Sequence, residues 1–67
     1  MKINFDTKHD IIRIKFQDGE YEKSKEVDEG IIVDMDKNNK IIAIEILDAS
    51  DRIPKGNLKE FSMNISE

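Results

Sequence analysis

Hydrophobic and polar residues alternate along much of this 67-residue chain, and the alternation has the period of a β-strand. Residues 11–16 are the clearest case, because apolar residues fill the even positions and two of the odd positions are basic. Residues 2–5 repeat the pattern over a shorter span. Twelve isoleucines strengthen the prediction, since a β-branched side chain favours the pleated surface of a sheet. Both stretches are therefore predicted to be half-buried strands.

Two further stretches, residues 30–35 and 40–47, are apolar on nearly both sides. Strands of this kind are typical of a central position in a sheet, with something covering each face. Between them, residues 36–39 read DKNN, and asparagine tolerates the left-handed backbone of a tight turn. We therefore predict a hairpin.

Residues 21–27 have a weaker pattern, because Lys23 and Lys25 interrupt the side that carries Tyr21 and Val27. Charges of this kind are common on edge strands, where they discourage pairing with other chains. We predict a poorly buried edge strand here. The Glu and Lys content leaves a helix open as the alternative.

The pattern changes after Leu47. The segment DASD at 48–51 can begin a helical turn, with the Asp48 carboxylate accepting from early backbone N–H groups. Pro54 and Gly56 limit that helix to a turn or two. For residues 57–65 we favour a short helix that runs into a strand or extended tail. The predicted fold is mainly β (α+β): one domain over residues 1–67, an antiparallel meander of about five strands with a short C-terminal helical segment.

Composition narrows the possible partners and cofactors. The net charge is −4, and nine of the eleven basic residues are lysines, so nucleic acid is a poor candidate ligand. The chain has no cysteine and one histidine, which leaves no basis for a thiolate or histidine metal site, and we expect no cofactor. The longest aliphatic run, at 41–44, is far too short for a membrane helix, and the N-terminus does not resemble a signal peptide. We expect a soluble cytoplasmic protein.

A calcium loop is one candidate site. In DMDKNNKIIAIE, at 34–45, Asp34, Asp36, Asn38 and Glu45 have the ligand spacing of an EF-hand. However, an EF-hand loop lies between two helices, whereas both flanks here read as strands, and a strand would carry Glu45 away from the turn. We favour a hairpin with solvated acids. The alternative is a weak divalent-cation site at Asp34, Asp36 and Asn38.

Catalysis has little support in the sequence. His9 lies between Lys8 and Asp10 in a connecting segment, where a histidine is usually a solvated polar residue. The serines lack the context of an activated nucleophile, and no glycine-rich phosphate loop is present. A small sheet also offers little volume for a cleft. We therefore expect that the protein is not an enzyme.

Association with another protein is the better prediction. One short helix and a tail must cover a whole face of the sheet, and where they fall short a second copy or a different protein can complete the cover. The residues of the two central strands that we expect at such an interface are Ile32, Ile41, Ala43 and Leu47.

Four segments together resemble the small prokaryotic family DUF2283: MKINFD at 1–6, DIIRI at 10–14, EVDEGIIVD at 26–34 and IAIEILDAS at 42–50. The resemblance covers residues 1–53. Where the family usually has a proline, an aromatic residue and a turn glycine, this chain has Thr7, Arg13 and none in 36–39. The resemblance implies a small β-rich fold with no established activity, and an association with toxin–antitoxin-like gene pairs. We therefore expect an interaction module, either a homodimer or the small partner of such a pair.

Overall fold

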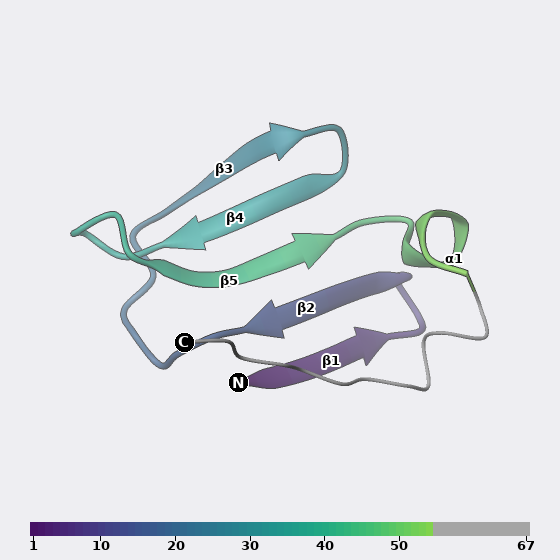
Figure 1. The fold of residues 1–67 in the computed structure, drawn as a ribbon, viewed down its shortest axis with the longest axis horizontal. Coiled ribbons are helices and arrows are strands. Elements are labelled where there is room, and N and C mark those ends of the chain that lie inside the picture. The colour runs from purple at the N-terminus through teal and green to yellow at the C-terminus, as the bar shows by residue number, and fades with distance from the viewer. Residues whose placement is uncertain (55–67) are drawn as a thin grey trace, which may run out of the picture.

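The computed structural model describes residues 1–54, which form one antiparallel sheet followed by a short helix (Figure 1). The elements are β1 (Lys2–Asp6), β2 (Ile11–Lys15), β3 (Lys23–Asp28), β4 (Ile31–Met35), β5 (Ile41–Ile46) and α1 (Ala49–Arg52). The prediction of a mainly β, antiparallel, five-stranded fold with a short helical segment after the last strand is confirmed. The prediction for residues 57–65 lies outside the described residues.

The sheet is meander-like, and its strand order is β1-β2-β5-β4-β3. Two hairpins join β3, β4 and β5, and they fold back so that β5 pairs with β2, as Figure 1 shows. The order has a physical reason. β5 is rich in isoleucine and takes the middle position, whereas all six residues of β3 are exposed and that strand takes an edge. The predicted edge strand and the predicted central strands are confirmed.

The tight turns use residues that tolerate a positive φ. Gly30 has φ 71° between β3 and β4, and Asn39 has φ 62° between β4 and β5. The predicted hairpin at 36–39 is confirmed: the Asp36 Oδ1 atom accepts from the N–H groups of Asn38 at 2.8 Å and Lys40 at 2.9 Å. This carboxylate therefore stabilises the turn itself.

The start of α1 differs from the prediction. Asp48 has a left-handed backbone, with φ 51°, and its side chain makes no capping hydrogen bond. A cap residue normally has an extended backbone that brings its side chain onto the first turn, and the left-handed conformation does not. Asp10, in the β1–β2 connection, does the capping instead. Its carboxylate accepts from the Ser50 N–H group at 3.1 Å and from the Ser50 hydroxyl at 2.7 Å, and its carbonyl accepts from the Ala49 N–H group at 3.0 Å.

The strand register sorts the side chains onto two faces, since directly paired residues of an antiparallel sheet share a face. Pairs such as Ile14↔Ile44 and Val33↔Ile44 define an apolar face. The apolar residues of this face are Ile3, Phe5, Ile12, Ile14, Ile31, Val33, Ile42, Ile44 and Ile46, and Lys25 lies at its border in β3. Pairs such as Arg13↔Glu45 and Asp34↔Ala43 define a polar face. Its members include Lys2, Asn4, Arg13, Lys15, Ser24, Glu26, Ile32, Asp34, Ala43 and Glu45.

Candidate functional site

The apolar face is the most extended hydrophobic surface of the described chain, and it is only partly covered. Ile42 is 3% exposed and Ile12 is 6% exposed, and these two are the buried members of this face. The other members of this face are intermediate in exposure or, for Ile3, exposed. Within residues 1–54 no large side chain is completely buried. The sheet therefore presents a broad area of apolar side chains that are incompletely shielded from water.

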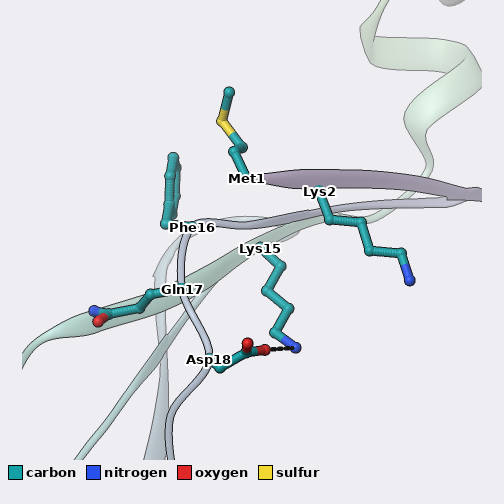
Figure 2. A pocket seen from close by; sticks show the side chains of 6 residues that line it. All are labelled: Met1, Lys2, Lys15, Phe16, Gln17 and Asp18. Carbon is teal, nitrogen blue, oxygen red and sulfur yellow. Dashed lines mark ion pairs between the residues drawn. The ribbon is translucent and has the colours of Figure 1, made fainter.

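Two exposed residues extend this apolar area at the end of the sheet where the chain begins. Phe16 follows β2 and its N–H group donates to the Ile42 carbonyl at 2.8 Å, and it is 44% exposed. Met1 precedes β1 and is also exposed. In Figure 2 both side chains point to one side of the ribbon, and the side chains of Lys2 and Lys15 point to the other.

The polar face is organised around Asp34, whose 4% exposure makes it the one buried charged or polar residue of the described chain. The Ser24 hydroxyl donates to its Oδ1 atom, and an Arg13 guanidinium nitrogen lies 3.6 Å from its Oδ2 atom. Ser24 also lies 3.2 Å from the Tyr21 hydroxyl. These contacts join β2, β3 and β4 through side chains.

Glu45 belongs to the same cluster, because it pairs with Arg13 on one side and with Ile32 on the other. Burial raises the pKa of the Glu45 carboxyl group, and hydrogen bonding to Asp34 and the negative charge of Asp34 raise it further. The Arg13 charge acts in the opposite direction. The cluster around Asp34 thus holds two neighbouring carboxyl groups and one guanidinium group.

The turn that resembles a calcium loop has its oxygens arranged differently from an EF-hand. The Asp34 carboxylate contacts Ser24 and Arg13, whereas the Asp36 carboxylate accepts backbone N–H groups of the turn. Glu45 lies in β5, as the sequence predicts. Within residues 1–54 no group of three or more His, Cys, Asp or Glu side chains is placed to hold a metal ion.

His9 is held in the β1–β2 connection. Its Nδ1 atom lies 2.9 Å from the Asp6 carboxylate, and its side chain is 62% exposed. The hydrogen bond from His9 lowers the pKa of the Asp6 carboxyl group, and backbone N–H groups of the same turn contribute. This arrangement explains His9 as part of a turn. The expectation that the protein is not an enzyme stays a prediction.

A comparison of the chain with known protein families gives one match. The family model described as "Protein of unknown function (DUF2283)" matches residues 2–50, which include all five strands and the Asp10–Ser50 contact. The chain belongs to the DUF2283 family. No curated protein and no solved structure matches the chain. The resemblance found in the sequence is confirmed over those residues.

Three of the four residues expected at an interface lie on the polar face of this DUF2283 domain, and their contact with a partner stays a prediction. Ile32, Ile41 and Ala43 belong to the polar face by strand alternation, and Leu47 follows β5. Ile41 is 45% exposed and Ile32 is intermediate, but Ala43 is 0% exposed. Ala43 is small and lies between its pairing partners Lys15 and Asp34, whose side chains are longer. In this structure Ala43 has no surface of its own to offer a partner.

Sequence reasoning missed two features of the DUF2283 domain. One is the Asp34 cluster, and its only signal was an acid in the middle of an apolar strand. The other is Asp10, which lies 40 positions from Ser50. Neither contact follows from local spacing, because each depends on which strands become neighbours. Within residues 1–54 no helix is long and apolar enough to cross a membrane.

Proposed function

We propose that this protein functions as a protein–protein interaction module, and that the apolar face of the sheet associates with the same face of a second copy. The observation that supports the proposal is an apolar face of nine residues on a single sheet, seven of which are partly or largely exposed. Two sheets that pack face to face bury such residues in a layer about 10 Å thick. A large contiguous apolar patch is also a common sign of an interaction site.

The distribution of charge fits a symmetric contact. Among residues 1–54, the strand pairs at the centre of the apolar face include no charged residue. At the border of this face, Lys25 of β3 pairs with Val33. Stable interfaces have the same anatomy, with an apolar centre and a polar rim. A two-fold dimer needs only that the surface complement itself, and a broad apolar face does so.

Light scattering coupled to size-exclusion chromatography tests the proposal. We expect a particle of twice the 7.8 kDa chain mass. The double substitution Ile3→Gln and Phe16→Gln should produce monomers, because both residues are already substantially exposed and contribute little to the core. The matched control is Ile41→Gln, since Ile41 has similar exposure on the polar face and should leave the dimer intact.

The outcomes separate the candidates. A monomer at concentrations up to about 1 mM would contradict self-association, since its binding free energy would then be weaker than about −4 kcal/mol. Dissociation by Ile41→Gln alone would place the interface on the face that carries Ile32 and Ile41, as the sequence suggests. A monomer that forms a stable 1:1 complex with the product of an adjacent gene would favour the toxin–antitoxin-like alternative.

A weak divalent-cation site is the competing proposal from a different class. One observation favours it: a hollow of about 250 Å³ beside the β4–β5 turn is lined by Glu20, Glu22, Asp36, Lys37 and Asn38, although the three carboxyl groups are not gathered around one point in this structure. Calorimetric titration with calcium decides between them, with Asp36→Asn as the variant and Asp51→Asn as the control. The cation proposal would be contradicted if millimolar calcium gave no heat of binding, or if the heat were the same for the Asp36→Asn variant.

A further inference from the structure

A basic hollow lies on the polar face, away from the proposed dimer surface. Lys2, Asn4, Arg13 and Lys15 line it, and its volume is about 330 Å³. The register explains why these four side chains meet: Lys2 pairs with Lys15 and Asn4 pairs with Arg13 across β1 and β2. Figure 2 shows the Lys2 and Lys15 side chains extending to the same side of the sheet.

The concentration of positive charge here contrasts with the chain as a whole, which has a net charge of −4. Two lysines directly opposite each other on neighbouring strands repel, so this pair weakens the sheet unless an anion lies between or beside them. Lys15 has one carboxylate partner, Asp18, at 2.7 Å, but the Asp18 side chain is 97% exposed. Within residues 1–54 Lys2 forms no salt bridge.

Arg13 gives the hollow a positioned donor. Its guanidinium group lies 3.6 Å from Asp34, and that carboxylate is held in place by Ser24 and by its own burial. A guanidinium group presents several N–H donors in a plane, so a contact with Asp34 leaves others for a ligand. The Asn4 amide adds a neutral donor of the same kind.

We infer that the hollow formed by Lys2, Asn4, Arg13 and Lys15 binds a small phosphate-bearing molecule. Three cationic groups and an amide around one hollow match the several charge-assisted hydrogen bonds that a phosphate group accepts. The volume corresponds to a small molecule, near the lower end of ligand sites in proteins. The overall negative charge opposes a nucleic-acid strand, which would extend beyond the hollow.

Nuclear magnetic resonance titration with inorganic phosphate at constant ionic strength tests this inference. We expect saturable shifts in the backbone amides of Lys2, Asn4, Arg13 and Lys15, with an apparent Kd on the order of 1 mM. The double substitution Lys2→Gln and Lys15→Gln should weaken binding at least about tenfold. The matched control, Lys23→Gln with Lys25→Gln, removes the same charge from β3 and should leave the Kd unchanged.

Asp18 supplies a second and opposite test. The substitution Asp18→Asn removes the carboxylate that competes for Lys15, so phosphate should bind about two- to threefold more tightly. Because the exposed Asp18 side chain makes few other contacts, this variant should fold normally. An unchanged or weaker Kd would contradict the role given to Lys15.

Other results would overturn the inference. These are shifts that do not saturate, an equal loss of affinity in the β3 control, or succinate binding as tightly as phosphate. Micromolar binding of a single-stranded oligonucleotide would replace the small-molecule ligand with a polymer. The dimer proposal is tested separately, since Ile3→Gln with Phe16→Gln alters the other face and should preserve phosphate binding.

Discussion

Ile41 and Ile42 are neighbours in β5, yet Ile42 is 3% exposed and Ile41 is 45% exposed. The difference follows from the alternation of side chains across the sheet, which sends Ile42 to the apolar face and Ile41 to the polar face. On the apolar face, isoleucines from several strands pack side by side. On the polar face of the sheet, the buried residues are Ala43 and Asp34, which pair with each other across β5 and β4.

The comparison shows that the two faces of β5 contribute to the stability of the fold through different interactions. The apolar face depends on the amount of hydrophobic surface removed from water, which is only loosely tied to particular partners. The polar face depends on specific pairs, because a buried carboxylate is stabilised only by donors in the correct positions. The two faces should therefore respond differently to single substitutions.

The largest effect should come from Ile42→Ala. Removing most of a buried isoleucine side chain costs about 2–5 kcal/mol in the free energy of unfolding. The same change at Ile41 should cost less than about 1 kcal/mol, because that side chain is already half exposed. Urea denaturation of both variants measures the difference. Equal costs would contradict the assignment of the two faces.

The second largest loss of stability should come from substitution of Asp10, although this residue is polar and lies in the connection between β1 and β2. Asp10→Ala removes the acceptor for the Ser50 N–H and hydroxyl groups and places alanine at φ 57°. Together the lost cap and the left-handed backbone should cost about 2 kcal/mol of stability. Asp10→Asn keeps an acceptor and tolerates this backbone, so it should cost less than half as much. Thermal unfolding followed by circular dichroism provides the measurement.

Asp34 tests the polar face directly. Asp34→Ala should cost about 1–2 kcal/mol, because the Ser24 hydroxyl and the Arg13 guanidinium lose an acceptor but can still reach water. Glu26→Ala alters the same face at an exposed position and should change stability by less than about 0.5 kcal/mol. A similar value for the two variants in chemical denaturation would show that the Asp34 cluster contributes nothing to folding.

Much of this fold can be predicted from the sequence, because local residue patterns determine where the strands and turns lie. Alternation locates the strands, Lys23 and Lys25 mark the edge, and DKNN marks the hairpin. Strand order cannot be predicted in this way, because the pairing of β5 with β2 depends on how two hairpins that are distant in the sequence meet. The same limit applies to the site. The pattern of 30–35 and 40–47 shows apolar residues on both sides, but it cannot show that Ala43 becomes buried between Lys15 and Asp34. It also cannot show that Asp10 replaces Asp48 as the cap.

The smallest predicted effect concerns pH, and it is the most specific to the polar face. The pKa of Glu45 is raised in the folded protein, so the folded state binds its proton more tightly than the unfolded state does. As pH rises from the ordinary value of 4.5 through the raised pKa, the folded state therefore loses stability from this group. Glu45→Gln removes the charge that conflicts with Asp34, and it should stabilise the protein at pH 7 by less than about 1 kcal/mol, since Glu45 is partly exposed. Denaturation midpoints of the two proteins should converge below pH 4.5.

Asp6 and Asp18 behave in the opposite way, because their lowered pKa values add stability that is lost as pH falls below about 3.8. The natural chain and the Glu45→Gln variant share that loss. A Glu45→Gln variant that is less stable at pH 7 than at pH 4, relative to the natural chain, would show that the charged carboxylate stabilises the sheet through Arg13 instead.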